Sequence, residues 1–591
     1  MRISINSFMG MAPRLAAQKL RAEQGQIATN VDLYAGELRP MPRPSALGKL
    51  AAGSVKALFL YQDRWLTFNE NADFVQGPIY EDHLNRVYCS FEFRAPSLFK
   101  NDDMSVNEDG DDVVALRTLG VPAPISAPSV SVVGGTGDVT ESRTYVITYV
   151  TDLGEEGDIS PASTVVDVKI DSTVSLSGIS VPSADSFVVK KRIYRSNTGS
   201  SDTKFQFVAE IDAAAESYTD SIASSDLGET LSTEGFVPPP ADMRGLIALP
   251  GGIMAGFTGK TVCFSEPYHP YAWPTKYQLT TNYDIVGLGR IGSVLVVLTS
   301  ALVYLVQCAD PATASMDSFD DIAPCVSKRG IVSSRWGVIY PSTQGLVSVT
   351  LTGVNLITRD LFTRREWDKL KPETIHGYIH ADKYIGFHHP DSGGKGFIVD
   401  PVEPAARLVD ISLNAVAGYV RPEDDLCLAV PGGDGHKVLS WAQNSMTPHV
   451  MQWRSKDFRT PHTLNFSTAK VMCDPPDVVT AEEWAVIRDK LIGQEGEEIK
   501  ANPGGCLNDG HLGRYAMNGS RLDVVAATYS PPAPVVFRLY GNGKLRHACE
   551  VVDGYPFRLP GGYSAQSWEV EVTGSRPVKE IHLVTSVSEL S

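Results

Sequence analysis

The segment IMAGFTGKTVCFS, residues 253–265, contains two short apolar runs separated by the turn sequence TGK. This pattern predicts a β-hairpin, because glycine supplies the backbone angles that a tight reversal needs. The same strand–turn–strand pattern occurs five times between Ile253 and Trp441. The predicted hairpins are Ile253–Phe257 with Thr261–Ser265, Ser293–Thr299 with Leu302–Gln307, Gly337–Pro341 with Gly345–Leu351, Lys383–His388 with Lys395–Asp400, and Leu426–Val430 with Lys437–Trp441.

The spacing of the five hairpins is nearly regular. Their first residues are 40, 44, 46 and 43 positions apart. A period of about 40–50 residues with several short strands per repeat is typical of a β-propeller, whose blades must stack to bury their faces. We therefore predict a mainly β fold built on a propeller. An array of ordinary β-sandwiches with fortuitous spacing is the alternative.

The composition is that of a globular protein with several domains. The chain has 591 residues, of which 43% are hydrophobic and 20% charged. Its 52 basic and 69 acidic residues leave a net charge of −17. This balance argues against tight wrapping of nucleic acid, which needs a basic surface. It is compatible with a channel that guides nucleic acid, where repulsion would prevent sticking.

No segment predicts a membrane span or a secretion signal. The longest apolar run, Val294–Val306, is interrupted by Thr299 and Ser300 and is too short to cross a bilayer. The first residues lack the apolar core of a signal peptide. The cysteines form no C-x-x-C pair, so we expect reduced thiols in a protein made in the cytoplasm. They are Cys89, Cys263, Cys308, Cys325, Cys427, Cys473, Cys506 and Cys549.

Composition changes along the chain predict five regions. Residues 1–46 are an extended lead-in with little periodicity, in which Pro40, Pro42 and Pro44 forbid helix and favour an edge segment. Residues 47–121 hold N-terminal propeller strands that meet the later blades, followed by an acidic linker. Residues 122–240 form an inserted fibronectin type III-like β-sandwich, and residues 241–466 the main blades. Residues 467–591 form a small C-terminal β-domain with a helix at 480–492, capped by Thr480 and Glu483.

The predicted insert is the most acidic part of the chain. It has 17 acidic and seven basic residues, which account for ten of the 17 net negative charges. A solvated outer face explains this composition, and a docking surface for a basic partner is the alternative.

Three motifs resemble ligand sites without meeting their requirements. Gly287, Gly289 and Gly292 match G-x-G-x-x-G, followed by Asp310, but the next residues are β-branched and predict a strand instead of the helix that a dinucleotide site needs. These glycines are expected to let the strand of one blade turn into the next. The acidic loop at 107–112 lacks the spacing and the closing Glu of an EF-hand, so we expect a solvated linker.

The third motif is a group of histidines. They are His376, His380, His388 and His389. Zinc binding would require three or four of them to converge. A spacing of four residues covers about 13 Å along a strand, and adjacent residues of a strand point to opposite faces. Together with the absence of any G-x-S-x-G, Walker or H-E-x-x-H motif, this predicts no metal, cofactor-binding or catalytic residues and no enzyme.

Three segments resemble the tail nozzle proteins of short-tailed bacteriophages, the tail tubular protein B-like family. They are GQIATNVDLYAGELRPMPRP (25–44), LRTLGVPAPISAP (116–128) and FRLPGGYSAQSWEVEVTGSRPVKEIHLVTSVSEL (557–590). The resemblance implies a six-fold ring of this chain below a tail adaptor protein, extending the channel through which genomic DNA leaves the capsid. It also implies contacts with tail fibres or a tail plug or needle, and a place in the virion tail after assembly in the host cytoplasm. The family offers no catalytic residues to transfer.

Two other functions remain open from the sequence. A carbohydrate-active or other hydrolytic propeller could act at the host surface, although no S-x-D-x-G-x-x-W box of the sialidase type occurs. A monomeric adhesin or fibre-associated binding module is the second alternative. Assembly into a ring distinguishes the nozzle from both.

Overall fold

The structure is a computed structural model of the 591-residue chain. It divides into two compact units. Unit 1 comprises Met1–Asn69, Glu108–Asp111 and Asp321–Ser591, and unit 2 comprises Glu70–Asn107 and Asp112–Asp320. The structure describes residues 1–33, 35–50, 53–107, 111–169, 171–198, 203–389, 393–403, 408–432, 435–444, 448–473, 534–551 and 554–590.

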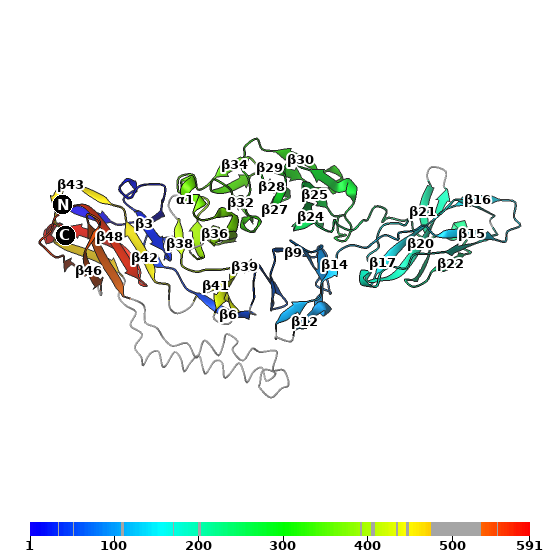
Figure 1. The fold of residues 1–591 in the computed structure, drawn as a ribbon, viewed down its shortest axis with the longest axis horizontal. Coiled ribbons are helices and arrows are strands. Elements are labelled where there is room, and N and C mark those ends of the chain that lie inside the picture. The colour runs from blue at the N-terminus through cyan, green and yellow to red at the C-terminus, as the bar shows by residue number, and fades with distance from the viewer. Residues whose placement is uncertain are drawn as a thin grey trace, which may run out of the picture. The chain divides into compact units, whose positions relative to one another are not determined.

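All five predicted hairpins are present, and each forms the two middle strands of a four-stranded antiparallel arrangement. Such a meander is the unit of a β-propeller blade, so the predicted fold class is confirmed (Figure 1). In unit 2 the blades are β23 (Arg244–Leu249), β24 (Ile253–Thr258), β25 (Thr261–Phe264) and β26 (Gln278–Thr280), then β27 (Ile285–Ile291), β28 (Val294–Thr299), β29 (Val303–Gln307) and β30 (Ser315–Ser318). In unit 1 they are β31 (Val332–Ser334), β32 (Gly337–Pro341), β33 (Leu346–Thr350) and β34 (Gly353–Leu356), then β35 (His376–His380), β36 (Lys383–His388), β37 (Lys395–Val399) and β38 (Val409–Ile411), then β39 (Ala417–Val420), β40 (Leu426–Gly432), β41 (Gly435–Asn444) and β6 (Pro44–Leu50).

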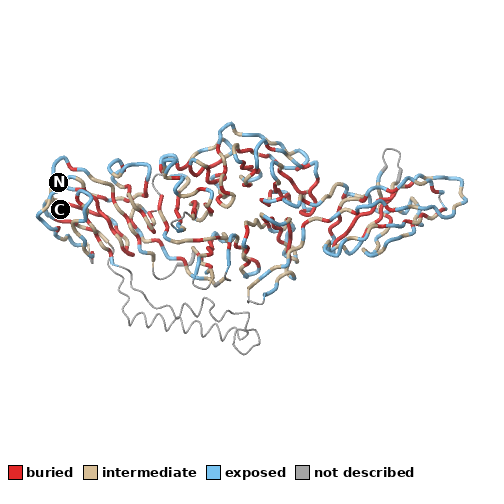
Figure 2. Tube along the Cα trace, in the orientation of Figure 1, coloured by how far each residue is buried: buried red, intermediate tan, exposed pale blue. Residues whose placement is uncertain are grey.

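The middle strands are the most buried part of each blade. In β28, Leu295 to Leu298 are fully buried, whereas β30 is mostly exposed. A strand covered on both faces must be apolar throughout, because no side chain can reach water. Buried segments are red in Figure 2, and the burial of the middle strands explains why the sequence shows each middle hairpin as apolar runs.

The last blade of unit 1 takes its fourth strand from the beginning of the chain. Strand β6 pairs antiparallel with β41, with Gly48 opposite Val438. Pro44 begins this outer strand, a position where a missing N–H is tolerated. The hairpin of β7 (Ala57–Tyr61) and β8 (Arg64–Phe68) packs on the same blade, since Leu58 lies in one apolar cluster with Ala417 and Val438. N-terminal strands therefore complete and cover the last blade of unit 1.

Unit 2 contains a further four-stranded sheet from the N-terminal region. Its order is β14 (Arg117–Thr118), β11 (Ser97–Phe99), β10 (Val87–Phe91) and β9 (Ala72–Gln76). The acidic loop connects β12 (Met104–Val106) to β13 (Asp112–Val114), and residues 108–110 of this loop lie outside the described residues.

The insert of unit 2 is a β-sandwich, as predicted. One of its sheets pairs β17 (Tyr145–Thr151), β20 (Val188–Thr198) and β21 (Thr203–Asp212). The others pair β15 (Ser129–Val133), β19 (Thr173–Ser177) and β22 (Ser217–Asp220), and β16 (Thr140–Arg143) with β18 (Val166–Lys169). Tyr145, Leu176 and Ile193 are buried in a core shared by these sheets.

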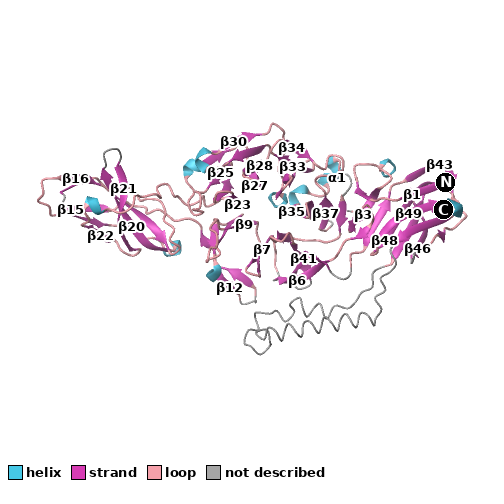
Figure 3. Cartoon of the chain, turned by 180° about the vertical axis from the view of Figure 1, so that it is seen from behind, coloured by secondary structure: helices cyan, strands magenta, loops and turns pink. Residues whose placement is uncertain are grey.

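The C-terminal β-domain contains more of the chain than the sequence indicated. Strand β1 (Arg2–Ile5) pairs with β49 (Val578–Val584), which pairs with β44 (Thr468–Cys473), and β44 pairs with β47 (Phe557–Arg558). A second path joins β3 (Gln24–Thr29), β42 (Met451–Ser455), β48 (Ala565–Gly574), β45 (Val535–Gly541) and β46 (Lys544–Val551); off it, β2 (Met9–Met11) pairs with β3 and β43 (Phe458–Leu464) with β48. The lead-in is thus not simply extended, because its strands fill positions in these sheets (Figure 3). The predicted helix at 480–492 lies outside the described residues; within them, the α-helix is α1 (Arg364–Asp368).

Candidate functional site

A polar pocket of about 490 Å³ lies in unit 1, beside the start of β43. Its lining comes from two distant parts of the sequence: Gln18 and Lys19 of the short 3-10 helix Ala17–Lys19, and residues 456–459. Two hydrogen bonds hold these segments together. The Asp457 N–H donates to the Ala17 carbonyl at 3.1 Å, and Lys456 Nζ donates to the Leu20 carbonyl at 2.6 Å.

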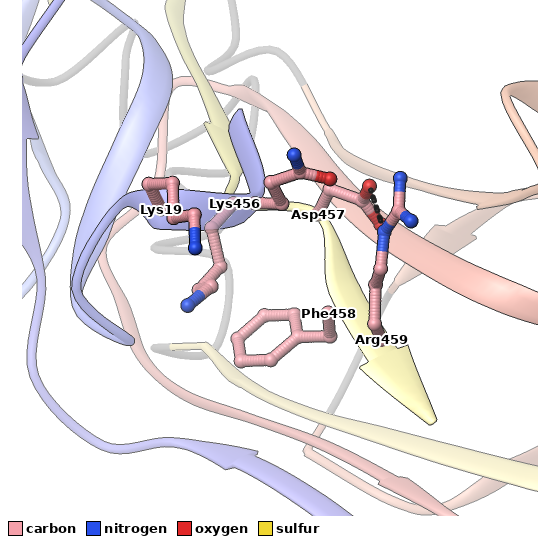
Figure 4. A pocket seen from close by; sticks show the side chains of 6 residues that line it. Lys19, Lys456, Asp457, Phe458 and Arg459 are labelled. Carbon is pink, nitrogen blue, oxygen red and sulfur yellow. Dashed lines mark hydrogen bonds and ion pairs between the residues drawn. The ribbon is translucent and has the colours of Figure 1, made fainter. Parts of the chain in front are cut away.

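The pocket carries more positive than negative charge. Lys19, Lys456 and Arg459 line it together with the carboxylate of Asp457. That carboxylate is already engaged, since Arg459 Nε lies 3.3 Å from one oxygen and the Ser567 hydroxyl donates to the other at 2.6 Å. Within the described residues, no ion pair is found for Lys19 or Lys456. Figure 4 shows the amino groups of Lys19 and Lys456 on the same side of the pocket, next to the Phe458 ring.

Sequence reasoning did not find this pocket. The alternation Lys456-Asp457-Phe458-Arg459 is a visible charged pattern at the start of a strand. Lys19 lies more than 400 residues earlier in the chain, and no local pattern links the two segments.

The structure brings two of the four predicted histidines together. His376 Nε2 lies 3.3 Å from His389 Nε2, and the two rings stack with an interplanar angle of 13°. His380 is directed elsewhere, with Nδ1 2.7 Å from the Asp424 carbonyl oxygen. His388 packs near Phe397 instead, with ring centroids 6.1 Å apart.

The buried His376 is held as a neutral ring. Nε2 lies 3.0 Å from the Ala415 carbonyl oxygen, which can only accept, so Nε2 carries the proton and Nδ1 accepts from the Tyr378 hydroxyl at 3.0 Å. Burial, with the nearby Arg329 charge, lowers the pKa of His376 well below its usual value. Burial also lowers the pKa of His388 to about 4. With both nitrogens of His376 engaged, this ring has no free lone pair for a metal.

The described residues contain no group of three or more His, Cys, Asp or Glu side chains that could hold a metal ion. Seven of the eight cysteines are described and all are free thiols, while Cys506 lies outside the described residues. Five of the seven are buried, and burial raises the pKa of Cys263 and of Cys325 to about 12, which disfavours the reactive thiolate. No helix in the described part of the chain is long and apolar enough to span a membrane.

The glycine-rich motif lies inside a blade. Gly287 and Gly289 are in β27, and Gly292 has a positive φ of 60° in the turn to β28. A strand follows where a dinucleotide site needs a helix N-terminus. The turn joins two strands of the same blade, so the expectation that the glycines connect successive blades is wrong. Asp310 caps the short 3-10 helix Pro311–Thr313 by accepting from the Ala312 N–H at 2.9 Å.

No protein-family model matches the chain, and no curated protein is similar to it in sequence. Solved structures that align with this chain include Hsv2 of Kluyvelomyces marxianus. It has 11% identity over 44% of this chain and 69% of that chain, with a TM-score of 0.22. BBS1N in complex with ARL6DN has 9% identity over 67% of this chain and 97% of that chain, with a TM-score of 0.28. The AfRom2 CNH domain has 8% identity over 67% of this chain and 98% of that chain, with a TM-score of 0.26. With TM-scores below 0.5, these similarities carry no functional argument.

Proposed function

We propose that this chain is a structural subunit of the tail nozzle of a short-tailed bacteriophage. In this role it forms a ring, six-fold as the sequence resemblance implies, that extends the channel for DNA ejection. It is not an enzyme. Its neighbours are a tail adaptor protein above it and tail fibres or a plug or needle, and it resides in the virion tail.

The observation that carries the proposal is the packing of two of the family-like segments. Residues 25–44 and 557–590 are separated by more than 500 positions in the sequence. Both contribute to the C-terminal β-domain: β3 and β48 pair with opposite edges of β42, and Leu38 forms a bridge with Val578. The two segments therefore form one structural element, as expected if the resemblance reflects a common architecture.

The third family-like segment lies in unit 2 and also supports the proposal. Residues 116–128 contain β14, an edge strand of the sheet β14-β11-β10-β9, and lead from it into the insert. Val121 is fully buried in a cluster with Tyr149 and Trp273. Gly120, with a φ of 99°, lies so close to the prolines that close the insert that a Cβ there would be 2.4 Å from Pro238 Cβ. The segments that enter and leave the insert are thus packed against each other.

The charge of the chain also fits a conduit. DNA passing through a lumen without sequence-specific binding requires walls that repel phosphate, and the net charge of −17 supplies negative residues for them. Propeller blades provide a rigid wall that needs no catalytic grouping.

Co-expression of the full-length chain with the neighbouring tail proteins tests this proposal. A tagged pull-down followed by negative-stain imaging should show six-fold rings with an axial channel that co-purify with an adaptor protein. Single particles that bind glycan or cell-wall material and form no ring in any condition would refute the nozzle and favour a hydrolytic or adhesin propeller.

A further inference from the structure

We propose that the pocket between Gln18–Lys19 and residues 456–459 binds an oxyanion of the phosphate class. Every residue that lines this site belongs to unit 1 of one chain. The proposal rests on the charge of the pocket, on the groups that are left to bind a ligand, and on its size.

Charge is the first argument. The three cationic side chains face one carboxylate, in a chain whose overall charge is −17. Asp457 is neutralised by Arg459, so the ammonium groups of Lys19 and Lys456 remain without a counter-ion among the described residues. Two such charges near each other repel, and an anion placed between them would relieve that repulsion.

The held geometry of Lys456 is the second argument. Its Nζ is fixed by the Leu20 carbonyl at 2.6 Å and lies 5.7 Å from the centroid of the Phe458 ring. An ammonium has three donors, so this contact leaves others for a ligand. Phosphate is favoured over a single carboxylate because, free or as a monoester, it carries about −1.5 to −2 charges at neutral pH, which matches two lysines. A phosphodiester carries one negative charge and would match one of them.

The size of the pocket is the third argument. The pocket of about 490 Å³ is open to solvent, so a bound oxyanion need not be a small free ion. The pocket therefore has room for a phosphate that is attached to a larger group, which can pack on the Phe458 ring. Free phosphate, a phosphate monoester and a nucleic acid phosphodiester share the recognised chemistry, and the experiment separates them.

Isothermal titration calorimetry of the full-length chain provides the test, with inorganic phosphate, glycerol 3-phosphate and a short oligonucleotide as three probes at fixed ionic strength. Lys19→Met removes one charge from an exposed side chain that has no ion pair among the described residues. Lys456→Met removes the second charge. The matched control is Lys544→Met, which changes an exposed lysine at the start of β46, outside the pocket.

We expect at least one probe to bind, with Kd raised about ten-fold by Lys19→Met and unchanged by Lys544→Met, since a charge-assisted hydrogen bond contributes on that scale. Binding should weaken as salt increases. Binding by the small phosphates assigns a free phosphate or monoester, and binding by the oligonucleotide alone assigns a phosphodiester. Because Lys456→Met also removes a contact to Leu20, its melting temperature is measured alongside. No binding by any probe, or equal affinity for Lys19→Met and Lys544→Met, would overturn the proposal.

Discussion

Leu38 and Val578 are joined by two backbone hydrogen bonds. The Leu38 N–H donates to the Val578 carbonyl at 3.0 Å, and the Val578 N–H donates to the Leu38 carbonyl at 2.8 Å. Both side chains are fully buried in the core of the C-terminal β-domain. This pair connects the beginning and the end of the chain, as does the amino group of Met1, which lies 2.6 Å from Glu589 Oε1.

Leu38→Ala should therefore weaken the whole C-terminal β-domain. A Leu→Ala change at a buried site leaves a cavity and costs about 2–5 kcal/mol. Leu545→Ala is the control, since Leu545 is 54% exposed on β46 of the same domain and should change stability by no more than about 0.5 kcal/mol. Denaturant unfolding of both variants, followed by hydrogen exchange of β49, measures the effect. Equal stability of the two variants would contradict the role of this pair.

The buried carboxyl of Glu155 should make the stability of unit 2 depend on pH. It is buried beside Arg86, whose Nη1 lies 3.9 Å from Glu155 Oε1, and burial raises the pKa of this carboxyl to about 7. The folded state then holds a proton that the unfolded state releases near pH 4.5, so stability falls as the pH rises from about 4.5 to 7. The loss is about 3 kcal/mol above pH 7, at 1.36 kcal/mol per unit.

Glu155→Gln tests this dependence because glutamine cannot ionise. We expect the variant to gain stability over the native chain at pH 8 and to match it near pH 4.5. Glu234→Gln, at an exposed position of the insert, is the control. Thermal unfolding measured across this pH range gives the comparison, and a native chain whose stability increases from pH 5 to 8 relative to Glu155→Gln would refute the prediction.

Asp220→Ala should strongly destabilise the inserted sandwich. Its carboxylate accepts from Arg195 at 2.6 Å and from the Tyr145 hydroxyl at 2.8 Å, and both members of the ion pair are almost fully buried. Removal of one partner leaves a buried, unpaired guanidinium at a cost of about 3–5 kcal/mol. The exposed pair Lys190–Glu210 provides the contrast, since Lys190→Met should cost less than about 1 kcal/mol. Calorimetric unfolding that shows similar losses for both variants would disprove the distinction.

Two glycines of one blade should respond differently to alanine. Gly337, at the start of β32, has a φ of 125°, and a Cβ there would lie 2.1 Å from the Val349 carbonyl oxygen. Gly337→Ala is expected to cost at least about 2 kcal/mol through backbone strain and this clash. Gly353 has open space around its Cβ position, so Gly353→Ala should be neutral or stabilise by up to about 1 kcal/mol. Urea midpoints of the two variants measure the difference, and equal midpoints would count against the strained turn.

The blades were predictable because their signals are local. Apolar runs and a turn residue such as Gly259 or Gly292 specify two antiparallel strands a few residues apart, and the repeat of this pattern every 40–46 residues specifies stacked blades. The β-rich character of the insert at 122–240 is likewise local, since its strands, such as β20 and β21, are neighbours in the chain.

Pairings between strands that lie far apart in the chain have no local pattern in the sequence. Strand β6 completes a blade with β41, and β1 and β3 fill positions in C-terminal sheets, although the lead-in shows little periodicity. Contacts between side chains also depend on the tertiary structure. The hairpin of β35 and β36 pairs His376 with Phe387, and the His376 ring contacts His389 instead of His380. Lys19 and Lys456 line one pocket only because the fold brings their segments together.

The sequence by itself thus determined the strands, the hairpins and the blade repeat, because these depend on residues that are neighbours in the chain. The tertiary structure alone decided which distant strands share a sheet and which charges share a pocket. Those choices depend on burial and hydrogen bonding between segments hundreds of residues apart, and no local pattern of residue types encodes them.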